Sequence, residues 1–165
     1  MTRGAIAAQV GPRFARNVMT TQGQPIPDMQ DLLAGVGRAL LFWGHLEGVM
    51  EEALPQPQRT PLRRNGGGAT TTSLWRSARE DRPDADSPRF RALLEDLDSV
   101  SARRNLLAHG LWAARVDPTG AEPARVRCRD RSGEMQDLTL ADLHALAEQI
   151  EGLTREIRQV DLTGP

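Results

Sequence analysis

The spacing of apolar residues changes at Gly110, and this change most constrains the fold. Before Gly110, apolar residues recur every three or four positions along 28–54 and 87–110, as in helices that bury one face. After it, residues 111–116 and 124–130 alternate between apolar and polar, which is typical of strands. The helical spacing returns at 139–157. The sequence therefore predicts a mainly α-helical fold, with a small β-hairpin, or a three-stranded sheet that includes 134–138, between the last two long helices.

Local signals mark the ends of these elements. Asp28 and Thr139 each precede an acidic residue by three positions, which is the pattern of a capping box at a helix start. Ser87 followed by Pro88 is a typical cap with a proline at the first helical position. Gly110 is well placed as the stop of the second long helix. A shorter helix is expected at 71–80.

The chain has the length of one domain. Its 165 residues can bury a sizeable core, which must be aliphatic because aromatic residues make up only 4%. We expect a single domain over 27–160, a flexible N-terminal arm over 1–26, where glycine and proline are frequent, and a tail over 161–165. Residues 55–70, which are rich in proline, arginine and glycine, are predicted to form a linker.

Charge and composition limit the possible partners and location. The formal net charge is −1, so any binding of nucleic acid must depend on a local basic patch. The single Cys128 excludes an internal disulfide and fits a reducing compartment. No apolar run approaches the roughly 20 residues of a membrane span. We therefore expect a cytoplasmic protein without membrane contact, and we find no metal-ligand spacing and expect no cofactor.

Two charged residues fall on the apolar faces of the long helices. Glu47 lies near the centre of the stripe in the first, and Arg104 lies within the stripe in the second. A lone charge on a buried face is costly unless it finds a partner. We therefore predict that Glu47 and Arg104 meet between the two helices, which would be antiparallel neighbours, with the planar guanidinium facing the carboxylate.

Asn105 and His109 follow Arg104 on a neighbouring flank of the same helix. They are four residues apart, so Asn105 could orient the imidazole one turn away. A purely structural interpretation is equally open from the residues alone. In that interpretation, the Glu47–Arg104 pair only fixes the register of the two helices. Asn105 makes a hydrogen bond at the end of its helix, and His109 caps the last turn.

Three arginines share one face of the predicted strand 124–130. Because side chains alternate along a strand, Arg125, Arg127 and Arg129 point to the same side. They could contact the backbone of RNA, or they could form an ordinary solvated face beside nearby acidic residues. The opposite, inner face is expected to hold Trp112, Ala114, Val116, Val126 and Cys128.

The stretch Arg104-Asn105-Leu-Leu-Ala-His109 resembles the Arg-polar-x-x-x-His signature of HEPN domains. The longer string, which continues as Gly-Leu-Trp, is similar to a bacterial HEPN-like group. In that group a Trp-x-x-x-Glu segment in the first long helix precedes the motif, and Trp43 and Glu47 fit it. The β-hairpin and the closing helix fit as well. The resemblance covers roughly residues 28–160.

The resemblance implies an antiparallel helical bundle that dimerises with the motif near the interface, and a metal-independent endoribonuclease. His109 would move the proton of the ribose 2′-hydroxyl or of the leaving oxygen, Arg104 would stabilise the phosphorane, and Asn105 would hold His109 or contact phosphate. Such enzymes often act as toxins or phage-defence effectors, sometimes with a nucleotidyltransferase-type antitoxin as partner. The alternative is a non-catalytic helical interaction module in which the Glu47–Arg104 pair is structural.

Overall fold

The computed structural model describes residues 27–54, 70–80, 82 and 85–162, and these form a mainly helical fold with a three-stranded antiparallel sheet. In chain order the elements are α1 (Met29–Glu52), α2 (Thr71–Glu80), α3 (Pro88–Gly110), β1 (Leu111–Arg115), β2 (Arg125–Arg129), β3 (Met135–Thr139) and α4 (Leu140–Leu162). The predicted fold class is thus confirmed at this level. Helix α4 ends two residues beyond the predicted domain end at 160. The predicted arm 1–26 and most of the predicted linker lie outside the described residues.

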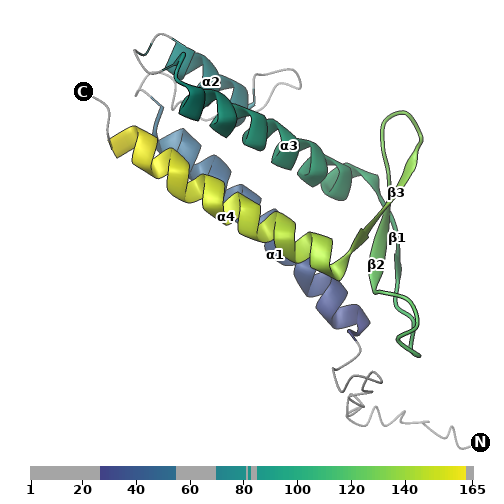
Figure 1. The fold of residues 1–165 in the computed structure, drawn as a ribbon. Coiled ribbons are helices and arrows are strands. Elements are labelled where there is room, and N and C mark those ends of the chain that lie inside the picture. Colours follow the sequence, from purple (N-terminus) through teal and green to yellow (C-terminus); the bar gives the residue numbers. More distant parts are fainter. Residues whose placement is uncertain (1–26, 55–69, 81, 83–84, 163–165) are drawn as a thin grey trace, which may run out of the picture.

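The long helices α1, α3 and α4 lie along one another, and the sheet extends from the end where α3 stops and α4 begins (Figure 1). Helix α3 runs opposite to α1 and α4, whereas α1 and α4 run in the same direction (Figure 1). Their shared core is mainly aliphatic, with Trp43 and Phe90 also buried in it, and includes the fully buried Leu46, Leu143 and Ile150. None of the described helices has both the length and the apolar character that crossing a membrane requires.

The predicted caps are present. The Asp28 carboxylate accepts hydrogen bonds from the backbone N–H groups of Gln30 and Asp31, and the Asp31 carboxylate accepts one from the Asp28 N–H at 2.9 Å. Thr139 and Asp142 make the same reciprocal pair at the start of α4. Hydrogen bonds from the Thr139 hydroxyl and N–H hold the pKa of Asp142 below its usual value. These bonds satisfy N–H groups that a helix start leaves without partners.

Helix α3 ends at Gly110 as predicted, but this glycine does not adopt the left-handed conformation that is common at helix ends. Positive φ values among the described glycines occur at Gly120 and Gly133, and not at Gly110. Instead, a Cβ at Gly110 would overlap the backbone carbonyl oxygen of Arg129 and would lie 3.2 Å from its carbonyl carbon. Glycine is required here because the end of α3 packs directly on the main chain of β2.

The sheet has the order β1-β2-β3, and its register corrects one prediction. Val126 and Cys128 are fully buried, and Ala114 packs against the core beside them. The pairing of β1 with β2 is irregular between Leu111 and Ala113, so Trp112 occupies a bulge. Trp112 was expected on the inner face, but its side chain is 68% exposed. The extra residue of the bulge breaks the alternation on which that expectation depended.

Candidate functional site

Glu47 and Arg104 meet between α1 and α3, as the sequence predicts. The Arg104 Nη2 atom lies 3.8 Å from the Glu47 Oε2 atom. The guanidinium also lies over the Trp43 ring, 5.2 Å from its centroid, and Arg104 Nη1 donates a hydrogen bond of 2.9 Å to Asn105 Oδ1. Trp43 itself is buried. Three different contacts therefore hold one guanidinium at the surface of the core.

Arg104 is not sealed by its acidic partner. Its side chain is 25% exposed and that of Glu47 is 34% exposed, so the ion pair is partly solvated. A guanidinium carries five N–H donors, and only one of them makes a described hydrogen bond. The group thus keeps donor capacity and a positive charge that the carboxylate, at a long distance, neutralises only in part.

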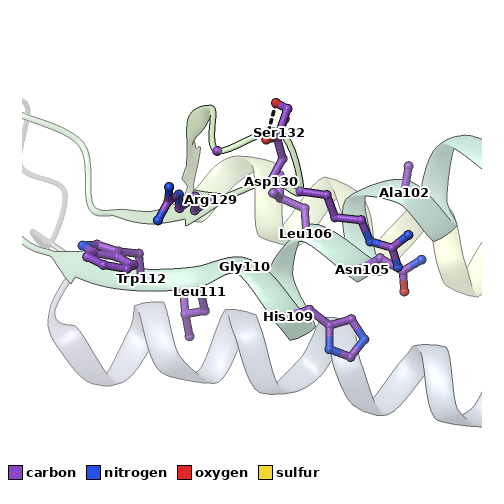
Figure 2. A pocket seen from close by; sticks show the side chains of 12 residues that line it. Ala102, Asn105, Leu106, His109, Gly110, Leu111, Trp112, Arg129, Asp130 and Ser132 are labelled. Atoms are coloured by element: carbon purple, nitrogen blue, oxygen red, sulfur yellow. Dashed lines mark hydrogen bonds between the residues drawn. The ribbon is translucent and has the colours of Figure 1, made fainter. Parts of the chain in front are cut away.

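Asn105 and His109 lie at a pocket rather than against each other. We expected Asn105 to orient the imidazole, whereas the described contact of its Oδ1 atom is with Arg104. Both Asn105 and His109 line an open pocket of about 780 Å³, and the His109 side chain is exposed (Figure 2). Asn105 therefore connects the guanidinium of Arg104 to a space that the imidazole of His109 also borders.

This space, which we call the helix-end pocket, is formed by the last turns of α3, the start of β1 and the turn between β2 and β3 (Figure 2). Besides Asn105 and His109, its lining includes Trp112, Arg129 and Arg131. The close contact of Gly110 with β2 brings the turn against the helix end. Residues that are more than twenty positions apart in the sequence thereby border one pocket.

The row of arginines on β2 divides into paired and unpaired members. Arg127 makes two hydrogen bonds to the Asp137 carboxylate, at 2.7 and 2.8 Å, and thereby holds the pKa of Asp137 below its usual value. Arg125 pairs with Glu122 at 2.6 Å. Within the described part of the chain, Arg129 has no acidic partner. The predicted RNA-contacting face therefore retains one uncompensated charge, and it lies in the helix-end pocket.

Arg131 is a pocket residue that the sequence alone did not single out. It is exposed and, among the described residues, has no ion-pair partner. Its place follows from the turn after β2, which Gly133 closes at a φ of 91°. A second arginine two positions after Arg129 was the available signal, because a tight turn keeps such residues near the end of the strand.

The acidic residue of this turn is held by the turn itself. The Asp130 carboxylate accepts a hydrogen bond from the Ser132 hydroxyl at 2.6 Å (Figure 2). It accepts a second hydrogen bond from the Glu134 N–H at 2.9 Å. The Ser132 bond is the main reason why the pKa of Asp130 lies below its usual value. Asp130 is thus a charged acid at the pocket whose Oδ1 atom is already engaged by the turn.

The pocket thus joins an exposed imidazole, an amide and two guanidiniums that have no ion-pair partner among the described residues, with a third guanidinium behind the amide. Within the described ranges, no group of three His, Cys, Asp or Glu side chains is placed to hold a metal ion. Comparisons of this chain with protein-family models, with curated proteins and with solved structures returned no match.

Proposed function

We propose that this chain is a HEPN-like endoribonuclease whose own side chains cleave RNA at the helix-end pocket. The observation that carries the proposal is the shared position of His109, Arg129 and Arg131 at one open pocket. An exposed imidazole can transfer protons, and unpaired guanidiniums bind phosphate. Asn105 adds a hydrogen-bonded connection to Arg104, so all three residues of the HEPN-like motif belong to one constellation.

The reaction that fits these groups is an internal transfer within RNA. The ribose 2′-oxygen attacks the adjacent phosphorus, a new P–O2′ bond forms, and the P–O5′ bond breaks. One proton leaves the 2′-hydroxyl and one is delivered to the 5′-oxygen, and His109 is suited to move either of them. The products are a 2′,3′-cyclic phosphate and a 5′-hydroxyl. A guanidinium held in place before the reaction, such as Arg104, stabilises the charge on the phosphorane.

The resemblance supports the remaining parts of the proposal. It favours an antiparallel bundle of the HEPN type, a homodimer with the motif near its interface, and a cytoplasmic toxin or phage-defence effector. A nucleotidyltransferase-type antitoxin would be the partner. The single buried Cys128 fits a reducing compartment.

The test is cleavage of an RNA pool of random sequence by the full chain in EDTA, next to a DNA pool of the same design. We expect cleavage of the RNA only, with a 2′,3′-cyclic phosphate at the new ends, because DNA lacks the attacking 2′-hydroxyl. Cleavage of the DNA pool, new ends that carry a 5′-phosphate, or complete inhibition by EDTA would contradict the proposed chemistry.

A non-catalytic interaction module is the second candidate, and the contacts of Arg104 with Trp43 and Glu47 favour it. In that case the guanidinium serves the packing of α1 on α3 and has no task at a phosphate. Removing the charge of Arg104 and removing the charge of Glu47 therefore test the two candidates. Glu47 contacts only Arg104 among the described ion pairs, so its removal breaks that pair and leaves the guanidinium in place.

We expect Arg104→Gln to lower RNA cleavage by about 10²- to 10³-fold, as loss of a preorganised charge-stabilising donor does. Glu47→Gln removes only a partly solvated ion pair, so it should change the free energy of unfolding by less than about 1 kcal/mol. Cleavage by Glu47→Gln should stay near the wild-type rate. Urea denaturation and the cleavage assay measure both. Full cleavage by a folded Arg104→Gln variant would show that this guanidinium has no role at the phosphate, and absence of cleavage by the wild-type chain would favour the interaction module.

A further inference from the structure

The side chain of Trp112 is largely exposed to solvent and does not contribute to the buried core of this chain. The chain has three tryptophans, of which Trp43 is 2% exposed, Trp75 is fully buried and Trp112 is 68% exposed. The bulge between Leu111 and Ala113 takes Trp112 off the inner face of the sheet. A large aromatic surface in contact with water is unfavourable, and bulges often re-aim a side chain next to a functional site.

The surroundings of Trp112 specify what the ring would bind. Trp112 lines the helix-end pocket together with Arg129, Arg131 and His109. Neither Arg129 nor Arg131 has an acidic partner among the described ion pairs. By contrast, Arg125 and Arg127, which share β2 and one of its faces with Arg129, are neutralised by Glu122 and Asp137. An exposed aromatic ring beside unpaired guanidiniums is the combination that binds single-stranded nucleic acid, in which bases stack on rings and phosphates contact cations.

We propose that Trp112 stacks on an unpaired base of single-stranded RNA while Arg129 and Arg131 hold its phosphates. This places a neighbouring phosphodiester at His109, so the inference rests on the proposed function and names the form of its substrate. Double-stranded RNA is a poor ligand, because its bases are stacked inside the helix and cannot reach the ring. Trp112 is here a substrate-binding residue, and its stacking is independent of base identity.

The charges of the pocket favour RNA over a protein partner. A protein interface gains from apolar neighbours and loses when unpaired charges are buried at its centre. The pocket instead places the ring beside two uncompensated guanidiniums, and its acid, Asp130, is engaged by Ser132 within the turn. Leu111 and Met135 are also exposed near this end of the sheet. The experiment must therefore distinguish an RNA-binding site from a protein-binding face.

Tryptophan fluorescence tests the stacking directly, because Trp43 and Trp75 are buried and Trp112 is the exposed ring. The measurements use the His109→Ala variant of the full chain, which is expected to bind RNA and to cleave it much more slowly than wild type. Single-stranded RNA of random sequence is expected to quench the fluorescence, and a duplex of the same length is not. Trp112→Phe in the same background should remove the quenching and retain most of the affinity, since a phenyl ring also stacks.

Affinity for dye-labelled RNA, measured by anisotropy, gives the second readout. Trp112→Ala should weaken binding on the order of 5- to 100-fold, the range found when a stacking ring is removed. Arg129→Gln and Arg131→Gln should each weaken binding and reduce the slope of log affinity against log salt by about 0.7. Arg127→Gln is the matched control, since its guanidinium is already paired, and it should leave both quantities close to those of the parent.

The outcomes separate this inference from the proposed catalysis. Quenching that depends on Trp112, together with an inactive wild-type chain, supports the binding site and overturns the ribonuclease. RNA cleavage that Trp112→Ala leaves unchanged overturns the stacking and leaves the ribonuclease intact. Equal quenching by duplex and single strand also overturns the inference. If RNA does not bind and Trp112→Ala alters the oligomeric state in analytical ultracentrifugation, the face is a protein interface and the inference is wrong.

Discussion

Replacement of His109 by alanine is expected to lower the rate of RNA cleavage by about 10²- to 10⁴-fold, the usual contribution of a general acid or base. The side chain is exposed, and no described hydrogen bond or ion pair involves it. Its removal should therefore change the free energy of unfolding by no more than about 0.5 kcal/mol. The loss of rate would then reflect chemistry and not misfolding. Single-turnover cleavage and urea denaturation of the same preparations measure the two effects.

His144 provides the matched control for this prediction. It is also an exposed histidine on a long helix, but it lies at the start of α4 and borders a different pocket. His144→Ala should cleave RNA at the wild-type rate. If His109→Ala cleaves as fast as wild type, or if both variants lose activity equally, His109 is not the proton-transfer group.

The second large effect is expected from Gly110→Ala, which should destabilise the fold by about 1–3 kcal/mol, in the upper part of that range. The added methyl group would overlap the carbonyl oxygen of Arg129, which belongs to the backbone of β2 and cannot rotate aside. Either β2 or the end of α3 must move. Urea denaturation followed by circular dichroism reports the change in the free energy of unfolding.

Gly44→Ala is the control for the general effect of glycine in a helix. Gly44 is exposed on α1, and a Cβ there would meet nothing within 4 Å. Because alanine favours the helix over glycine, this change should stabilise the protein by about 0.5–1 kcal/mol. The contrast in sign between two identical substitutions isolates the contact with β2. Equal stability of both variants would show that the end of α3 tolerates a side chain.

Several features could be predicted from the sequence because they depend on neighbours along the chain or on a strong energetic rule. Helical spacing and capping residues act locally, and they place α1, α3 and α4 to within a few residues. The pairing of Glu47 with Arg104 is not local, but two lone and opposite charges on buried faces leave few other solutions. The residues of the motif could thus be assigned to their elements before the structure was known.

The features that could not be predicted depend on strand register. The bulge adds one residue to β1, and this reverses the expected orientation of Trp112. The alternation of apolar and polar residues in the sequence gives no sign of the bulge. The neutralisation of Arg127 follows from its position opposite Asp137, which is ten residues away on β3. Arg131 belongs to the pocket only because the turn folds back to the helix end. Each of these facts requires knowledge of which residues face each other across the sheet.

The contact between Gly110 and Arg129 also determines how ready the pocket is for a ligand. It joins the last turn of α3 to β2 through main-chain atoms, so the helix that carries His109 and the strand that carries Arg129 pack directly against each other. Main-chain packing does not have to be assembled when a substrate arrives. A ligand that spans the imidazole and the guanidinium would therefore order only side chains, and less of its interaction energy would be lost to conformational entropy.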